Sequence, residues 1–257
     1  MLTILSPAKK LSKDCSALTK HNYLPRFLDK SQELINSLKN MEPKDLESLM
    51  GISENLAVLN WERFQGWKKC FKPEESMEAV YQFLGDTYTG LDAITLTGGD
   101  IAFAQKNTRI LSGLYGVLRP LDLIMPYRLE MGTKLKNKVG NNLYDYWGDT
   151  LIESINQELE SHNCNILVNC ASVEYFKSID RPLLNAEVIT PQFKEIKNGQ
   201  LKMISFYAKR ARGMMARFII QNQIENKNEI RAFNFGGYRW DSSLSTPLIP
   251  VFTRAIA

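Results

Sequence analysis

Short apolar runs, separated by long segments with helical periodicity, constrain the fold of this chain more than any other feature. The runs Leu2–Ser6, Ile110–Leu111 and Asn165–Cys170 are typical of buried strands. A later segment adds one antiparallel hairpin, because Asn198-Gly199 is a typical two-residue turn between alternating apolar residues. Together these patterns predict a mixed α/β fold, in which helices surround a central mixed β-sheet.

Helical signals fill the intervals between these runs. Predicted helices span Pro25–Asn40, Asp100–Lys106, Tyr144–Glu160 and Ala208–Ile224, and another begins at Pro73. Further strands are predicted near 187–196, 201–207 and Ile249–Phe252. Because no internal repeat, low-complexity tract or linker interrupts the pattern, residues 1–257 are predicted to form a single domain.

The composition is that of a soluble globular protein. The 257 residues are 44% hydrophobic and 23% charged, and the net charge is only +4. No stretch approaches the ~20 consecutive apolar residues that span a bilayer. The first residues, Met1–Pro7, lack the basic leader of a secretion signal. We therefore expect a cytoplasmic protein that does not bind membranes.

The cysteines and histidines are not spaced as metal ligands. The chain has four cysteines, Cys15, Cys70, Cys164 and Cys170, and none of them belongs to a CxxC pair. His162 lies close to Cys164 and Cys170, but Cys170 closes a predicted buried strand. We expect reduced thiols, buried structural cysteines in this region, no metal site and no cofactor.

The segment 49–57 resembles the turn of a helix-hairpin-helix element, which would span 43–67. Gly51 is expected to reverse the chain at positive φ, Ile52 to anchor the turn in the core, and Ser53 to cap the second helix. Such a turn offers backbone N–H groups to a DNA phosphate without reading a base. The usual second glycine of the motif is Ser53 here. An ordinary helix–glycine–helix connection would show the same pattern.

Residues 201–224 form a second predicted contact with phosphate. The segment has five positive charges and no Asp or Glu. On a helical wheel, one face holds Ala211, Met214, Met215 and Phe218, and the opposite face holds Lys209, Arg210, Arg212 and Arg217. A basic face of this kind predicts binding to DNA phosphates. A solvated basic helix face is the alternative.

Seven polar residues are the candidates for chemistry, because they follow predicted strands or form close charged pairs. They are Ser6, Lys9, Arg128, Glu130, Ser172, Glu174 and Tyr175. Ligands of open α/β sheets bind beyond the carboxyl ends of strands, so these side chains are candidates to converge on one cleft. No P-loop, GxGxxG, GxSxG or HExxH motif occurs in the sequence. No particular reaction is therefore predicted.

Several longer motifs resemble those of the bacterial YaaA family of peroxide stress proteins. They are Ser6–Lys9 (SPAK), Leu111–Asp122 (LSGLYGVLRPLD), Pro126–Gly132 (PYRLEMG), Ala171–Phe176 (ASVEYF) and Ala211–Gly213. The resemblance spans nearly the whole chain. It implies a cytosolic α/β protein with a helix-hairpin-helix element and a positively charged, DNA-binding cleft. It also implies resistance to hydrogen peroxide through limitation of intracellular iron and of oxidative damage.

Three functions are open at this point. The first is a DNA-binding stress protein that holds the backbone phosphates of duplex or branched DNA without sequence preference. The second is an enzyme that acts on a nucleotide or nucleic-acid base in a polar cleft. The third, direct iron binding, is disfavoured because no ligand spacing supports it. The non-enzymatic DNA-binding protein is the favoured prediction.

Overall fold

The fold is described from a computed structural model, for residues 1–14, 17–19, 21–70 and 72–256. Cys15, predicted to be a reduced thiol, lies outside these ranges.

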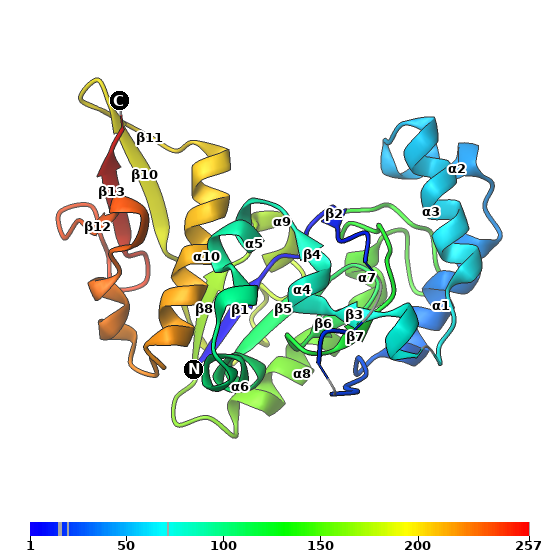
Figure 1. Cartoon of the computed structure of the whole chain (residues 1–257), viewed down its shortest axis with the longest axis horizontal. Helices are drawn as coiled ribbons and strands as arrows, with labels where there is room; N and C mark the ends of the chain where they lie inside the picture. Colours follow the sequence, from blue (N-terminus) through cyan, green and yellow to red (C-terminus); the bar gives the residue numbers. More distant parts are fainter. Residues whose placement is uncertain (15–16, 20, 71, 257) are drawn as a thin grey trace.

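A five-stranded mixed sheet lies at the centre of the molecule, in the order β6-β5-β1-β8-β9 (Figure 1). Its strands are β1 (Leu2–Leu5), β5 (Thr108–Ser112), β6 (Gly116–Leu118), β8 (Ile166–Cys170) and β9 (Glu187–Ile189). Strand β1 runs parallel to both β5 and β8, β9 runs parallel to β8, and β6 pairs antiparallel with β5. The three apolar runs are the central strands, which confirms the predicted mixed α/β fold. They are apolar because both faces of the sheet are covered.

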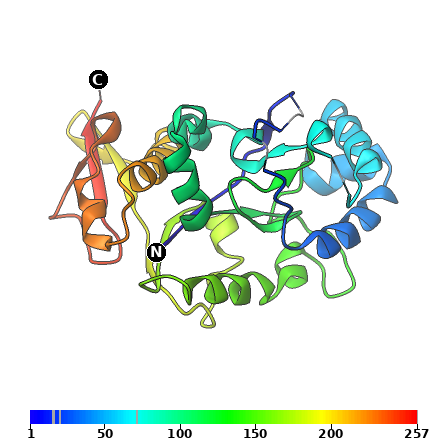
Figure 2. The same cartoon turned by 60° about the horizontal axis from the view of Figure 1, so that its bottom comes forward.

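Helices cover the two faces of this sheet. Helix α8 (Thr150–Leu159) lies on one face, and α5 (Asp86–Leu91), α6 (Gly98–Asn107) and α10 (Ser205–Gln221) lie on the other (Figure 2). None of the helices within the described residues combines the length and the apolar character needed to cross a bilayer.

A second, four-stranded sheet lies on the far side of α10, so this helix stands between the two sheets (Figure 1). Its order is β11 (Gln200–Lys202), β10 (Gln192–Lys197), β13 (Val251–Ala255) and β12 (Arg239–Trp240). The ring of Phe193 packs against those of Tyr238 and Phe252, with centroids 5.4 and 5.6 Å apart. The predicted hairpin is confirmed, because Asn198 and Gly199 turn the chain at φ 52° and 73°.

Helices α5 and α10 cross at two glycines. A Cβ atom on Gly213 would lie 1.8 Å from the carbonyl oxygen of Thr87, and one on Gly90 would lie 2.0 Å from that of Arg210. The Arg217 guanidinium also donates to carbonyl oxygens at the end of α5, at 2.9 and 2.7 Å. Because any side chain at these glycines would meet the backbone of the other helix, the crossing fixes the position of α10 relative to α5.

Three helices form the end of the molecule opposite the second sheet (Figure 1). They are α1 (Leu28–Lys39), α2 (Pro43–Met50) and α3 (Glu54–Gly66). Gly51 connects α2 to α3 at φ 59°, and Ile52 is 8% exposed, as the sequence predicts for both residues. The predicted Ser53 cap is wrong, since this side chain makes no capping hydrogen bond although Ser53 is the N-cap residue of α3.

The remaining elements are short. They are β2 (Lys10–Leu11), β3 (Met77–Glu78), β4 (Phe83–Leu84), β7 (Leu123–Ile124), α4 (Ala79–Gln82), α7 (Leu143–Trp147), α9 (Val173–Phe176) and four 3₁₀ turns, Pro73–Glu75, Ala93–Thr95, Lys227–Ala232 and Phe235–Gly237. Strands β2 and β4 pair with each other, as do β3 and β7.

Four predicted elements differ from the structure. The strand expected near 187–196 is two strands of different sheets, β9 and β10, because Pro191 between them has no N–H group for a continuous ladder. The helix expected from Pro73 is one 3₁₀ turn followed by β3, because the buried Glu78 carboxylate holds the backbone of Leu18 and Thr19 and its strand pairs with β7. The helix expected over Tyr144–Glu160 is broken into α7 and α8 at Gly148, where φ is 49°. The strand expected over 201–207 ends at Lys202, and α10 begins three residues before Ala208.

Candidate functional site

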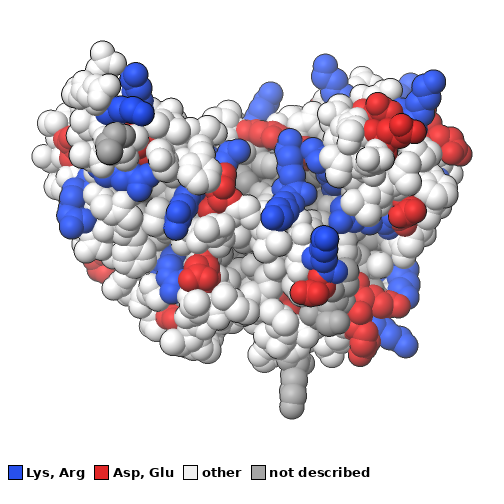
Figure 3. All heavy atoms as spheres, turned by 45° about the horizontal axis from the view of Figure 1, so that its top comes forward, with Lys and Arg blue, Asp and Glu red and all other residues white. Residues whose placement is uncertain are grey.

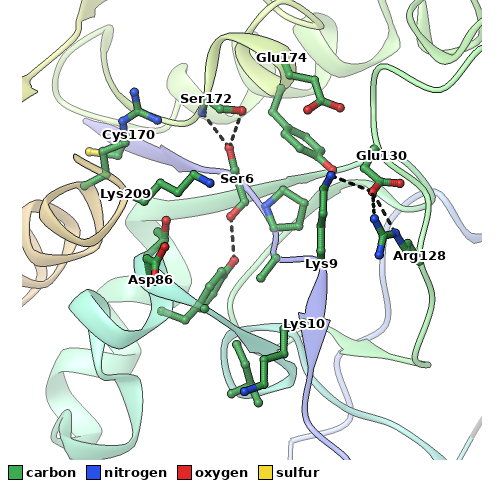
Figure 4. A pocket seen from close by; sticks show the side chains of 18 of the residues that line it. Ser6, Lys9, Lys10, Asp86, Arg128, Glu130, Cys170, Ser172, Glu174 and Lys209 are labelled. Carbon is green, nitrogen blue, oxygen red and sulfur yellow. Dashed lines mark hydrogen bonds and ion pairs between the residues drawn. The ribbon is translucent and has the colours of Figure 1, made fainter. Parts of the chain in front are cut away.

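The carboxyl ends of β1 and β8 open into a pocket of about 420 Å³ (Figure 4). Its lining includes all seven residues that the sequence singles out: Ser6, Lys9, Arg128, Glu130, Ser172, Glu174 and Tyr175. The structure therefore brings these seven residues together. They meet because adjacent parallel strands end at the same edge of the sheet, where ligands of open α/β sheets bind.

Two serines form the floor between the strand ends. The backbone N–H of Ser172 donates to Ser6 Oγ at 2.8 Å, and Ser6 Oγ donates to Ser172 Oγ at 3.3 Å. The Tyr88 hydroxyl donates to the Ser6 carbonyl oxygen at 3.0 Å. These bonds fix the backbone where the chain leaves β1, so the first residues after that strand keep one orientation toward the pocket.

Glu130 gathers the charged groups on the opposite side of the pocket. Its Oε1 atom accepts from Arg128 Nε at 3.0 Å and lies 2.9 Å from Arg128 Nη2 and 3.3 Å from Lys9 Nζ (Figure 4). The Oε2 atom is buried and has no hydrogen-bond partner among the described residues. A buried carboxylate oxygen without a partner is costly, so this atom is a candidate acceptor for a ligand N–H or O–H group.

Glu174 and Tyr175 complete this side. Glu174 Oε1 accepts from the backbone N–H of Gly132 at 2.9 Å, and a Cβ on Gly132 would lie 3.2 Å from the same oxygen. Burial raises the pKa of the Tyr175 hydroxyl well above its usual value, so at neutral pH it is a neutral phenol. The catalytic roles of these residues stay a prediction.

Helix α10 contributes two cations, Lys209 and Arg212, to the same pocket. Lys209 is exposed, Arg212 is half-buried, and neither forms a hydrogen bond or ion pair with any described residue. Burial lowers the pKa of the Arg212 guanidinium, but arginine stays charged at neutral pH. Two unpaired cations beside hydroxyl groups make this wall a candidate site for an anion.

The basic face predicted for α10 is therefore not one surface. Lys209 and Arg212 line the pocket, Arg210 is exposed but outside the lining, and Arg217 is held by the end of α5. The helical-wheel prediction of one continuous basic face is wrong, because both sheets and α5 cover α10. Ala211, Ala216 and Ile220 are all buried. The DNA contacts of these four cations stay a prediction, and Arg217 already has intramolecular partners.

The sequence analysis missed several other lining residues, among them four with ionisable or phenolic side chains. These four are Lys10, Asp86, Tyr88 and Tyr127. The first three come from β2 and from the start of α5, whose positions depend on the β2–β4 pairing and on the α5–α10 crossing. In the sequence, Gly85 was a local signal that the chain changes direction, and in the structure this glycine has φ 132°. The local sequence pattern does not show that this turn lies beside β1 in the fold.

A second groove, of about 680 Å³, shares Lys9, Glu130 and Glu174 with the pocket. It continues past Gly132, Thr133 and Lys134 to the end of α2, where its lining is Ser48, Leu49, Met50 and Gly51. The surface is hollowed in the middle, and Lys and Arg side chains lie on both sides of the hollow (Figure 3). Pocket and groove together thus connect α10 with the α2–α3 turn.

The α2–α3 turn has fewer free backbone N–H groups for a phosphate than its sequence predicts. The N–H groups of Gly51 and Ile52 both donate to the Glu47 carbonyl oxygen. The N–H groups left for an outside ligand are those of the first turn of α3. Residues 42–66 contain five acidic and only two basic residues, which disfavours a large phosphate contact here. The helix-hairpin-helix role in DNA binding stays a prediction.

The His and Cys side chains near β8 have separate surroundings. His162 Nδ1 lies 3.0 Å from the Met1 amino group, Cys164 Sγ contacts the Glu225 carbonyl oxygen at 3.5 Å, and Cys170 lines the pocket. Within the described ranges, no three His, Cys, Asp or Glu side chains are grouped to hold a metal ion.

Cys170 is expected to resist peroxide and alkylating reagents although it lines the pocket. Its side chain is 2% exposed, and burial raises the pKa of its thiol to about 12, which the nearby Arg212 only partly offsets. The reactive thiolate is therefore scarce at neutral and mildly alkaline pH. Iodoacetamide labelling at pH 8, followed by mass spectrometry, should modify the exposed Cys70 well before Cys170. Equal labelling in urea is the control, and equal labelling of the native protein would contradict this expectation.

Comparison with known proteins finds a family match and relatives along nearly the whole chain. A family model described as "Peroxide stress protein YaaA" matches residues 1–244. A UPF0246 protein of Shewanella baltica is 51% identical over 255 residues, which are 99% of each chain. UPF0246 proteins of Hahella chejuensis and of a Marinomonas strain are 48% and 49% identical over 254 residues, covering 99% of this chain and 99% and 97% of theirs. The chain therefore belongs to the YaaA family of peroxide stress proteins.

Proposed function

We propose that this protein acts in the cytoplasm as a DNA-binding peroxide stress protein, and that it holds backbone phosphates in the pocket and the adjoining groove. Family membership supports the role in peroxide stress. Protection of DNA from iron-dependent oxidation is the corresponding proposed outcome. The single observation that carries DNA binding is the pair of unpartnered cations, Lys209 and Arg212, in a pocket that continues into a groove.

Unpaired basic side chains are informative because most partly buried arginines in folded proteins have a partner. In this protein Arg109, Arg128 and Arg217 all pair with a carboxylate. Arg212 is half-buried and has none among the described residues. A phosphate would supply the missing partner, and a guanidinium binds phosphate in a bidentate, charge-assisted way.

The groove extends this contact toward α3. Lys9 and Lys134 line it, and its far end reaches Gly51, beyond which α3 begins. A DNA backbone that follows the groove would pass from the cations of α10 to the N-terminus of a 13-residue helix. That helix end favours an anion through its free N–H groups and its dipole. The acidic residues around it suggest that it positions one phosphate and that α10 supplies most of the attraction.

An enzyme that acts on a nucleotide or nucleic-acid base is the second proposed function. It is favoured by one observation, the buried and unpartnered Oε2 atom of Glu130 beside Arg128 and Lys9. A carboxylate held between two cations can orient a substrate or accept a proton from it. DNA binding and a reaction in the pocket are compatible, since the same phosphate contacts would serve both.

The proposed function is tested by fluorescence anisotropy with labelled duplex, bulged and branched DNA over a series of salt concentrations. Binding should occur at low salt, depend little on sequence, and weaken by orders of magnitude as salt rises above the physiological range. Absence of binding to every substrate at low salt would contradict the proposal. Affinity that does not change with salt would also contradict it, because phosphate contacts release counterions.

A further inference from the structure

We infer that the pocket accommodates one unstacked nucleotide, whose phosphate lies against Lys209 and Arg212 and whose base edge meets Glu130 and Arg128. This inference rests on the proposed function and names the part of DNA that enters the pocket. Its basis is that the lining presents two different kinds of unsatisfied groups. One wall has cations without partners, and the other has a paired carboxylate with a free buried oxygen.

The size of the pocket suits a single nucleotide. About 420 Å³ falls in the range of small-molecule sites, and the pocket lies at the carboxyl ends of β1 and β8. A base inside a duplex cannot reach such a site without leaving its stack. The adjoining groove is larger, about 680 Å³, and gives the rest of the strand a path away from the pocket.

The phosphate end is defined by groups from three elements. Lys209 points toward Ser6 in the interior of the pocket (Figure 4). Arg212 lines the same wall, and the Ser6 and Ser172 hydroxyls lie between the ends of β1 and β8. Hydroxyls and cations of this kind are the usual phosphate ligands of proteins. Asp86 also lines the pocket, so the cations must offset one carboxylate as well as hold the phosphate.

The base end combines one acceptor with one donor. Glu130 Oε2 has no partner, and Arg128 uses Nε and Nη2 for Glu130 Oε1, which leaves Nη1 without a hydrogen bond within the described residues. Every nucleic-acid base has a Watson–Crick edge with at least one N–H donor and one acceptor. This pair therefore distinguishes a base from a bare sugar phosphate, and it does not select among bases.

Aromatic side chains form the walls between the two ends. Tyr88, Tyr127 and Tyr175 line the pocket, and each is at most 8% exposed. Two of the rings are fixed through their hydroxyls, Tyr88 to the Ser6 carbonyl oxygen and Tyr127 to Ser112 Oγ at 2.6 Å. Rings that are held in this way offer apolar and π contacts to a base at little entropic cost, whatever its identity.

The first test uses free mononucleotides, so that it does not depend on binding of long DNA. Isothermal titration calorimetry should detect binding of dAMP and dCMP. By contrast, 2-deoxyribose 5-phosphate and deoxyadenosine should each bind at least about tenfold more weakly than dAMP. The double substitution Lys209→Ala and Arg212→Ala should abolish nucleotide binding. Lys106→Ala, which removes an exposed lysine from α6 outside the pocket, is the matched control and should bind normally.

Equal affinity for dAMP and 2-deoxyribose 5-phosphate would overturn the inference, because the base would then make no contact. This comparison uses the wild-type protein, so it does not depend on any variant that fails to fold. Glu130→Gln provides a second measurement. It should reduce dAMP affinity by about tenfold while leaving the affinity for inorganic phosphate unchanged, and an equal loss for both ligands would contradict the assignment of the base end.

The second test separates this inference from DNA binding itself. A bulged DNA with 2-aminopurine at the bulge is titrated while anisotropy reports binding and fluorescence intensity reports unstacking of the base. Binding without a rise in intensity overturns the nucleotide inference and leaves DNA binding intact. Mononucleotide binding without DNA binding has the opposite meaning, since the pocket assignment then stands and the proposed function fails. Both signals together support both.

Discussion

Replacing Gly213 by valine is expected to lower the free energy of unfolding by about 3 kcal/mol, the upper end of the cost of overpacking. A Cβ at this position would lie 1.8 Å from the carbonyl oxygen of Thr87 and 2.8 Å from the backbone nitrogen of Leu91. Both atoms belong to the backbone of α5, so no side chain can turn away to make room. The helices must separate or shift, and the pocket wall formed by α10 must move with them. Urea denaturation followed by circular dichroism measures this loss.

Gly66→Ala is the matched control for that experiment. Gly66 is the last residue of α3 and is exposed, and a Cβ at this position would have no neighbouring atom within 4 Å. Alanine there should leave stability unchanged or raise it slightly, because it restricts the unfolded chain. A Gly213→Val protein as stable as the Gly66→Ala protein would show that α5 and α10 are not in close contact, and that the pocket has a different wall.

Glu130→Gln is expected to abolish protection against hydrogen peroxide in cells that lack the native protein. The carboxylate is the shared counter-charge of Lys9 and Arg128, at 3.3 and 2.9 Å. An amide removes that charge and turns an NH₂ group toward one of the two cations or into the pocket. Survival after a peroxide pulse should fall to the level of cells without the protein, while immunoblotting shows normal abundance.

Glu187→Gln is the control for this experiment. It removes an ion pair with Lys227 at 2.6 Å on the outer strand of the central sheet, where both side chains are more than one-third exposed. Exposed pairs of this kind contribute little to stability, so survival should equal that of the wild type. Full protection by the Glu130→Gln protein would mean that the charged cluster is structural and has no part in the stress response.

The elements that sequence reasoning found correctly are those encoded by local pattern. The buried strands β1, β5 and β8 appear as apolar runs, and Asn198-Gly199 encodes its hairpin through two residues with positive φ. The errors have tertiary causes. The buried carboxylate of Glu78 accepts hydrogen bonds from the backbone N–H groups of Leu18 and Thr19. The sequence around Glu78 does not indicate these contacts.

The site was predictable to a similar degree. Ser6 and Ser172 meet because they follow neighbouring parallel strands, which a sheet order places together. The division of the α10 cations was not predictable, because it depends on the crossing with α5 at Gly90 and Gly213. A helical wheel assumes one buried and one solvated face, whereas α10 stands between two sheets and has several buried sides.

The most direct test of the central claim, that the cations of α10 hold DNA phosphates, is a comparison of salt dependence. Affinity for one bulged DNA is measured over a salt series for the wild type, for the Lys209→Ala and Arg212→Ala double variant, and for Lys106→Ala. The double variant should bind more weakly, and its slope of log affinity against log salt should be smaller by about one, because both removed cations neutralise the same phosphate. The Lys106→Ala slope should match the wild type. A double variant that folds normally and keeps the wild-type slope would contradict the claim, because the two cations would then not touch DNA.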